Sequence, residues 1–220
     1  MRKVFNRAVA PFLQFFSKYY FSKPRKYNYK GIKGLVMPNV FHPHFTWSTA
    51  LLIDFIEQYD LKDKKALELG CGTGILSAFM AKNGADVLAT DINALAIENA
   101  RINARRNEVK VETLLSDLFE RIPKTAFDFI LINPPYYPKT PTHIAENAWY
   151  CGADFEYFRR LFKEITDYFL NEMLVFMILS EDCDLMQIKT LADAEGWRLN
   201  EVYKKRKMGE KNFIFQLERI

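Results

Sequence analysis

The segment INPPYY, residues 132–137, has residue types and spacing that suggest chemistry. It follows FDFIL, an apolar run with the composition of a buried strand. Pro134 and Pro135 lack N–H donors and fix φ, so the strand ladder cannot continue through them. Asn133 is pushed toward an extended conformation by the proline that follows it. We therefore expect a stiff loop at the end of a strand, presenting outward carbonyls and one amide side chain.

A glycine-rich stretch, ELGCGTG at residues 68–74, follows another strand-like run. Gly70, Gly72 and Gly74 would let the chain turn tightly and bring its backbone close to a ligand. Asp91 ends the next predicted strand 21 residues after Gly70. An acidic side chain at an offset of roughly 20 residues can accept hydrogen bonds from ribose hydroxyls. Because both groups would lie at the carboxyl ends of neighbouring strands, the pattern predicts a nucleotide-containing ligand.

The spacing G-x-G-x-G resembles that of class I S-adenosylmethionine-dependent methyltransferases more than that of nicotinamide dehydrogenases. The resemblance implies S-adenosyl-L-methionine as cofactor and S-adenosyl-L-homocysteine as product. It places the glycine loop near the methionine part, Asp91 on the ribose and Asp117 near the adenine amine, with a turn cap as the alternative for Asp117. Glu68 either contacts the cofactor or orders the glycine loop. The predicted cofactor-binding residues are Thr49, Glu68, Gly70, Gly72, Gly74, Asp91, Ile92, Asp117, Leu118 and Asn133.

Beside such a cofactor, the proline-stiffened corner suits methyl transfer to a conjugated nitrogen. The lone pair of an amide or an exocyclic base amine is delocalised, and no base near neutral pH is strong enough to deprotonate it. The Asn133 side-chain oxygen and the Pro134 carbonyl can accept its N–H hydrogens and stabilise the positive charge that develops on nitrogen. The Tyr136 ring can stack on the planar target. We predict these three residues to be catalytic; the alternative is a rigid turn with a buried asparagine.

The Asn-Pro-Pro-Tyr motif resembles that of methyltransferases acting on glutamine amides or base amines. Residues 40–52, VFHPHFTWSTALL, and 148–162, AWYCGADFEYFRRLF, are similar to segments of the HemK/PrmC glutamine N-methyltransferase family. The likeness covers roughly residues 36–196 and implies that Trp47 and Thr49 border the cofactor. Cys151-Gly152 stands where that family has a double glycine, and no Gly-Arg-Glu follows. The N-terminal region is too short to match the substrate-binding domain of the bacterial release-factor enzymes.

Three functions remain open. The first is an N-methyltransferase acting on a glutamine side-chain amide of a protein, such as a translation factor or a ribosome-associated protein. The second methylates the exocyclic amine of adenine or another base in RNA or DNA, which must be unpaired or flipped to reach the pocket. The third is a non-catalytic protein whose basic, aromatic N-terminus binds RNA or a membrane surface. The intact Asn-Pro-Pro-Tyr motif argues against the third function.

Strand-like and helix-like segments alternate along most of the chain. Strands are predicted within residues 64–70, 86–92, 109–119, 127–132 and 173–180, and helices within 46–59, 75–84, 93–107, 154–170 and 184–196. Residues 197–207 and 212–220 form a predicted antiparallel pair. The alternation predicts an α/β fold with a doubly wound, mostly parallel seven-stranded sheet. Trp149 is expected to serve in packing.

Charge is unevenly distributed along the 220 residues. Residues 1–53 contain nine Lys and Arg but no Asp or Glu, although the whole chain has a net charge of only +4. This divides the chain into a basic, aromatic and partly helical N-terminal extension, residues 1–34, and a methyltransferase domain, residues 35–220. Residues 22–31 are expected to be a polar connector. The extension could contact RNA, the ribosome or an anionic membrane, or be a solvated arm; KKRK, 204–207, is expected on an exposed hairpin edge.

The remaining reactive side chains give little sign of a metal or redox site. Cys71, Cys151 and Cys183 are far apart and form no C-x-x-C, which indicates a reducing, cytoplasmic setting. His42 and His44 lack a third ligand at suitable spacing, so we expect them to line the pocket entrance rather than bind a metal. We expect neither a signal peptide nor a transmembrane segment.

Overall fold

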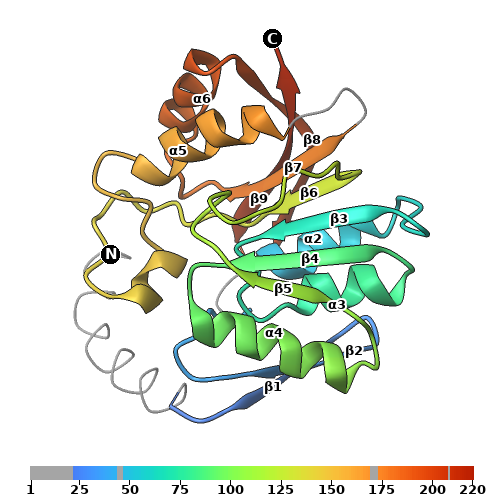
Figure 1. Cartoon of the computed structure of the whole chain (residues 1–220). Helices are drawn as coiled ribbons and strands as arrows, with labels where there is room; N and C mark the ends of the chain where they lie inside the picture. Colours follow the sequence, from blue (N-terminus) through green and yellow to red (C-terminus); the bar gives the residue numbers. More distant parts are fainter. Residues whose placement is uncertain (1–21, 44–46, 169–172, 208) are drawn as a thin grey trace.

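A seven-stranded sheet forms the centre of the computed structural model, which describes residues 22–43, 47–168, 173–207 and 209–220 (Figure 1). The strand order is β5-β4-β3-β6-β7-β9-β8. The strands are β3 (Lys65–Leu69), β4 (Asp86–Asp91), β5 (Glu112–Leu115), β6 (Phe129–Ile132), β7 (Leu174–Ser180), β8 (Trp197–Lys207) and β9 (Glu210–Arg219). The first five are parallel, whereas β9 is antiparallel to both β7 and β8. The predicted fold class is confirmed, including its antiparallel C-terminal pair.

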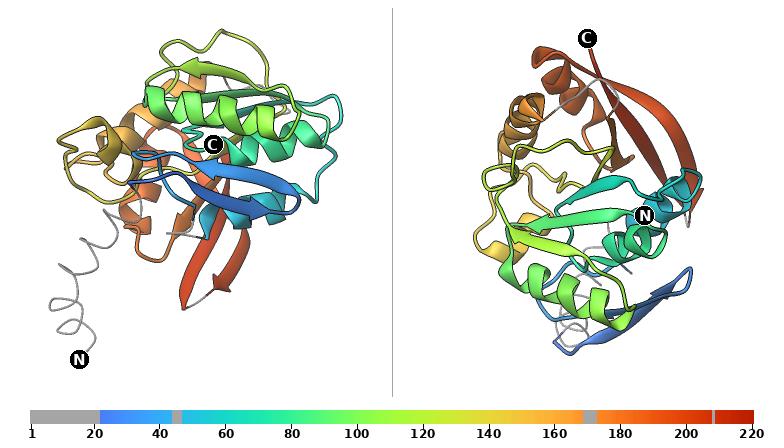
Figure 2. Two further views of the ribbon diagram at one scale, coloured as in Figure 1. Left: turned by 90° about the horizontal axis from the view of Figure 1, so that it is seen from below. Right: turned by 45° about the vertical axis from the view of Figure 1, so that its right-hand side comes forward.

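Helices cover both faces of the sheet (Figures 1 and 2). Helices α2 (Ser48–Ile56), α3 (Ile75–Lys82) and α4 (Ala94–Arg106) lie on one face, and α5 (Glu156–Glu164) and α6 (Leu185–Ala194) lie on the other. Strand β7 shows why both faces must be covered. Val175 and Met177 belong to the core under α5 and α6, whereas Phe176 and Ile178 belong to the core under α2 and α3. Successive side chains of a strand point to opposite faces, so a continuous apolar strand needs apolar cover on each side.

Helix α5 is shorter than the predicted helix over residues 154–170. It ends at Glu164 and continues as a single 3₁₀ turn, η2 (Ile165–Asp167). Phe158, Leu161, Phe162 and Ile165 are fully buried, as their spacing predicts. Phe169, which the same spacing predicts on this helix face, lies outside the described residues.

A β-hairpin replaces the polar connector predicted for residues 22–31, so that prediction was wrong. Strands β1 (Arg25–Tyr29) and β2 (Ile32–Val36) pair antiparallel, and the hairpin packs against α4 (Figures 1 and 2). Lys30 and Gly31 both have positive φ, 43° and 75°, as a two-residue hairpin loop of type I′ requires. The hairpin spans both sides of the predicted boundary between residues 34 and 35. The expected helical part of the extension, before residue 22, lies outside the described residues.

None of the helices in the described part of the chain has the length and apolar character needed to cross a membrane.

Substitution of Gly34 tests how closely the hairpin packs against α3. A Cβ at this position would lie 2.5 Å from the Tyr27 carbonyl oxygen and 2.8 Å from Cδ1 of Ile75 on α3. Gly34→Ala should therefore cost about 1–3 kcal/mol of folding free energy. This corresponds to a fall of roughly 2–12 °C in Tm for a chain of this size, measurable by differential scanning calorimetry. Exposed Asn28→Ala on the same hairpin is the control, and a Tm for Gly34→Ala equal to that of the control would contradict the packing.

Candidate active site

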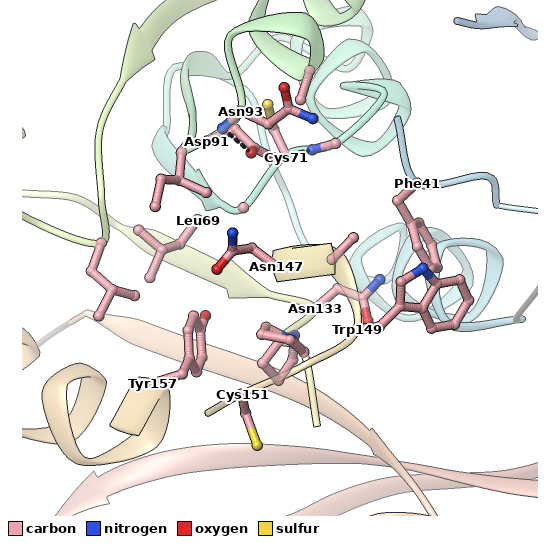
Figure 3. A pocket seen from close by; sticks show the side chains of 18 of the residues that line it. Phe41, Leu69, Cys71, Asp91, Asn93, Asn133, Asn147, Trp149, Cys151 and Tyr157 are labelled. Atoms are coloured by element: carbon pink, nitrogen blue, oxygen red, sulfur yellow. Dashed lines mark hydrogen bonds between the residues drawn. The ribbon is translucent and has the colours of Figure 1, made fainter. Parts of the chain in front are cut away.

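One cavity of about 360 Å³ lies at the carboxyl ends of the central strands, within the range typical of small-molecule sites (Figure 3). The structure brings nearly all the predicted site residues together around it. Those lining it are Thr49, Glu68, Gly70, Gly72, Asp91, Ile92, Asp117, Leu118, Asn133, Pro134 and Tyr136. They come from four strand ends and the start of α2, so the sheet topology is what assembles the site.

Gly74 is the predicted site residue that does not line the cavity. A Cβ at Gly74 would lie 2.5 Å from Cβ of Ala100, so the loop is pressed against α4 there. The three loop glycines Gly70, Gly72 and Gly74 all have left-handed φ, between 51° and 76°. Side chains are strained in this conformation, which explains why the loop is built from glycine. At position 74, glycine is required both by the left-handed backbone and by the close packing against Ala100.

Asp91 ties the end of β4 to the glycine loop. Its Oδ2 accepts a hydrogen bond of 2.8 Å from the backbone N–H of Gly72, and its Oδ1 accepts one of 2.8 Å from the N–H of Asn93 (Figure 3). Burial raises the pKa of this carboxyl, and the backbone hydrogen bonds partly oppose that shift. Asp91 thus holds the loop in shape while its carboxylate faces the cavity, where each oxygen keeps a lone pair for a ligand hydroxyl.

Glu68 is buried at the end of β3, beside the first turn of α3. Its Oε2 accepts a hydrogen bond of 2.8 Å from the N–H of Ser77 and a second from the Ser77 hydroxyl. The Glu68 side chain therefore satisfies a donor at the N-terminus of α3, where Gly74 provides no side-chain cap. These bonds support the interpretation that Glu68 orders the glycine loop. Burial, assisted by the charge of Asp91 and opposed by the bonds from Ser77, raises the pKa of Glu68 to about 8.

Asp117 forms an ion pair that was not predicted. Its Oδ2 lies 2.7 Å from Nη1 of Arg160 on α5. Arg160 also pairs with Glu120 at 3.1 Å and with Glu164 at 3.0 Å. The guanidinium thus holds Asp117 at the cavity edge, and each of its three nitrogens is paired with a different carboxylate. The two adjacent arginines of FRRLF were the available signal, but only the fold shows which one faces the site.

The proline corner lies beside the glycine loop, because β6 is the parallel neighbour of β3. Within the described part of the chain, the Asn133 side chain makes no hydrogen bond, and Figure 3 shows it at the cavity beside Trp149. Tyr136 also lines the cavity and packs against the core. The centroid of its ring lies 4.8 Å from that of the Tyr137 ring. Burial raises the pKa of Tyr136, so its hydroxyl stays protonated. The corner therefore offers one unengaged amide and one neutral aromatic ring.

The wall opposite the glycine loop was not predicted. It is the short helix η1 (Ile144–Ala148) with the residues that follow it. Hydrogen bonds from Tyr137 N–H to the Trp149 carbonyl and from Cys151 N–H to the Tyr137 carbonyl, both 3.0 Å, close the base of this segment. Trp149 packs at 5.1 Å against Phe41, which joins the wall to the chain before α2. Trp149 thus packs within this wall and lines the cavity as well, so its predicted role in packing rather than in substrate stacking stays a prediction.

Two residues expected at the cavity lie elsewhere. His42 is buried, at 2% exposure, and is not among the lining residues, so its predicted place at the pocket entrance was wrong. His44 lies outside the described residues. Trp47 is also absent from the lining and packs under the Lys207 ammonium, 3.7 Å from its ring centroid. The described residues contain no cluster of three or more side chains that could hold a metal ion.

The family model described as "Methyltransferase small domain" matches residues 35–148. The chain belongs to this family. It is an S-adenosylmethionine-dependent methyltransferase with a Rossmann-like fold. The matched range contains the glycine loop, Asp91, Asp117 and the proline corner, which are the features that sequence and structure bring to the cavity.

Two curated relatives match part of the chain. A "Putative protein N5-glutamine methyltransferase" of Methanocaldococcus jannaschii is 42% identical over 110 residues, which cover 50% of this methyltransferase and 53% of the relative. The ribosomal RNA small subunit methyltransferase C of Hamiltonella defensa is 31% identical over 126 residues, which cover 56% of this chain and 37% of that one. The chain thus spans about half the length of the first relative and less of the second.

The solved structure of the Thermus thermophilus 16S rRNA N2 G1207 methyltransferase, in complex with AdoMet and guanosine, has the same fold. The TM-score is 0.63 and the sequence identity is 16%. The matched region covers 88% of this chain and 50% of that chain. At this identity the likeness concerns the fold alone.

The raised pKa of Glu68 gives a prediction about stability. The unfolded carboxyl loses its proton near its ordinary pKa of 4.5, whereas the native one keeps it up to about 8. The native state thus binds more protons across this window, so the contribution of Glu68 to stability falls as pH rises from about 5 to 8. Glu68→Gln, which keeps an acceptor for Ser77 but cannot ionise, should gain Tm relative to the wild type over this range.

The measurement is Tm by differential scanning fluorimetry at pH 5, 6, 7 and 8. Exposed Glu112→Gln on β5 is the matched control and should show no such trend. A constant Tm difference between Glu68→Gln and the wild type across the four pH values would refute the raised pKa.

Proposed function

We propose that this methyltransferase transfers a methyl group from S-adenosyl-L-methionine to the side-chain amide nitrogen of a glutamine in a protein. The observation that carries the proposal is the unengaged Asn133 amide at the cavity, on a proline-stiffened corner next to the glycine loop. An amide oxygen can accept N–H hydrogens without taking up a proton at neutral pH, and this suits a target nitrogen too weakly basic to be activated by deprotonation.

The residues around the cavity fit the cofactor. Asp91 would hold the ribose hydroxyls, the glycine loop would approach the methionine part, and Asp117, Ile92 and Leu118 would border the adenine. When bound, S-adenosyl-L-methionine supplies an electrophilic methyl group and leaves as S-adenosyl-L-homocysteine. Thr49 and Glu68 lie on the loop side of the same cavity. In this proposal Glu68 acts by fixing the loop through Ser77.

Asn133, Pro134 and Tyr136 would act on the acceptor. The Asn133 Oδ1 and the Pro134 carbonyl accept the two N–H hydrogens of the target amide, which favours a pyramidal nitrogen with its lone pair directed at the methyl group. As the new N–C bond forms, these oxygens stabilise the positive charge on nitrogen, and the surplus proton passes from this site to water. The Tyr136 ring holds the plane of the amide, which contributes the orientation that catalysis requires.

The charges of the cavity favour a neutral amide over a nucleotide. The charged side chains among its described lining residues are three carboxylates and one guanidinium, namely Asp91, Asp117, Glu156 and Arg160, whereas the buried Glu68 keeps its proton up to a pH of about 8. All three donor nitrogens of Arg160 are already paired with carboxylates. A flipped base carries phosphates to the pocket entrance, and nucleic-acid sites use cations to bind them. The 42% identity to the M. jannaschii relative, by its name a protein glutamine methyltransferase, supports the same choice.

Methylation of the exocyclic amine of a base is the second candidate. It is favoured by the 31% identity to a ribosomal RNA methyltransferase and by the basic residues of the first 53 positions. The proline corner would serve both targets, since an exocyclic amine and an amide are both planar conjugated nitrogens. A basic N-terminus would also suit a protein substrate held on a ribosome, which keeps a translation factor or a ribosome-associated protein as the preferred partner class, in the cytoplasm.

Replacing Asn133 tests the chemistry. Asn133→Ala removes one acceptor for the developing charge, and loss of one such preorganised group typically lowers kcat by about 10²–10³-fold. The affinity for S-adenosyl-L-homocysteine, measured by isothermal titration calorimetry, should change far less. Asn133→Asp keeps an acceptor oxygen and should fall between the wild type and the Ala variant. Equal rates in Asn133→Ala and the wild type would remove Asn133 from the mechanism.

The substrate class is tested by labelled methyl transfer. Purified enzyme and labelled S-adenosyl-L-methionine are added to extract from cells lacking the protein, and the product is digested with protease or with nuclease. We expect protease alone to release the label, and acid hydrolysis to release labelled methylamine from the modified amide. Release of the label by nuclease alone would contradict the protein substrate and support methylation of a nucleic-acid base. The Asn133→Ala variant, added to the same extract, gives the background level of labelling.

A further inference from the structure

Three asparagines on one face of α4 hold the N-terminal hairpin. Asn99, Asn103 and Asn107, the asparagine ladder, are spaced four residues apart and face the outer edge of β2. Their Oδ1 atoms accept hydrogen bonds from the backbone N–H groups of Met37, Leu35 and Lys33, at 2.8, 2.7 and 2.8 Å respectively. The ladder therefore takes the place of a neighbouring strand along this edge.

The match between helix and strand has a simple geometric cause. Four residues of helix rise by about 6 Å, and two residues of strand advance by about 6.6 Å. Every second residue of β2 directs its backbone N–H and C=O to the same edge. An asparagine four residues further along the helix therefore lies opposite the N–H and C=O groups of the strand residue two positions away. The amide nitrogens complete the pairing by donating to the carbonyls of Leu35 and Lys33, at 2.7–3.1 Å.

Asn103 differs from its two neighbours because it also reaches the cofactor loop. Its Nδ2 donates to the carbonyl of Thr73, in the middle of the glycine loop, at 2.9 Å. It also donates to the Leu35 carbonyl at 2.9 Å, so both of its amide hydrogens are used. Asn103 is completely buried. Within the described part of the chain, neither Asn99 nor Asn107 bonds to this loop; their partners are on the hairpin or, for Asn107, also on α4 itself.

We propose that Asn103 is a positioning residue for cofactor binding, and that through it the β1–β2 hairpin forms part of the cofactor site. The other loop contacts act at different points: Gly70 and Cys71 donate to the Thr90 carbonyl, and Gly72 donates to Asp91. Among the described residues, the bond from Asn103 is the one that holds the Thr73 carbonyl. Without it, the left-handed turn between Gly72 and Gly74 loses its anchor to α4.

Asn103 and Asn107 allow a matched comparison, because both hold β2 but only Asn103 holds the loop. We expect Asn103→Ala to raise the dissociation constant for S-adenosyl-L-homocysteine at least tenfold, measured by isothermal titration calorimetry well below the Tm of each variant. Asn107→Ala should raise it less than twofold. In the ligand-free proteins, amide hydrogen exchange at residues 70–74 should accelerate in Asn103→Ala and stay at the wild-type rate in Asn107→Ala. Neither readout depends on the methyl acceptor.

A second measurement on the wild-type protein covers the case in which Asn103→Ala does not fold. Coupling between sites is reciprocal, so binding of S-adenosyl-L-homocysteine should stabilise the hairpin through the same side chain. The Leu35 amide, bonded to Asn103, should be protected from exchange by the ligand more strongly than the Lys33 amide, bonded to Asn107. Equal protection of the two amides, or equal loss of affinity in the two variants, would overturn the proposal, as would an unchanged dissociation constant in Asn103→Ala.

Discussion

The active site depends on how a loop with almost no side chains is held in place. A run of left-handed glycines has many alternative conformations, and its entropy must be offset by bonds to its backbone. Gly70 and Cys71 donate to the Thr90 carbonyl, and three side chains on different elements hold the loop and the helix start that follows it. Glu68 on β3 fixes the start of α3 through Ser77, Asp91 on β4 binds the Gly72 N–H, and Asn103 on α4 binds the Thr73 carbonyl. The loop is therefore shaped by acceptors and donors outside it.

The sheet topology explains why the glycine loop and the proline corner meet. Strand β3 lies between β4 and β6, so the chain proceeds outward in one direction through β4 and β5 and then crosses to the other side for β6. The carboxyl ends of β3 and β6 flank the point at which strand order reverses, where open α/β sheets bind their ligands. Residues that are far apart in the sequence, such as Gly72 and Asn133, thus line one cavity. No further contact is needed to bring them together.

Strong periodicity and motif spacing made the sheet and most of the cavity predictable. Apolar runs followed by glycines or prolines mark strand ends, and parallel strands necessarily place those ends at one edge. The hairpin was missed because basic and polar residues interrupt its apolar pattern, and only Tyr27 of RKYNY is buried. It is held by core packing and by the asparagine ladder, which is a tertiary contact over more than 60 residues of sequence. Arg160 and the η1 wall were missed for a similar reason, since each acts through partners that only the fold brings near.

The family domain does not by itself decide the substrate. The family match ends at Ala148, and relatives that share it are named for protein or for RNA targets. The C-terminal strand pair, which lies outside the match, packs against α2 and Trp47, away from the lining of the cavity. Lys205 of the C-terminal strand pair lies 3.5 Å from Asp54 of α2, and Lys207 covers Trp47 just before that helix. These cations are thus occupied by protein partners beside α2, and an acidic or phosphate-bearing substrate would have to compete with those partners.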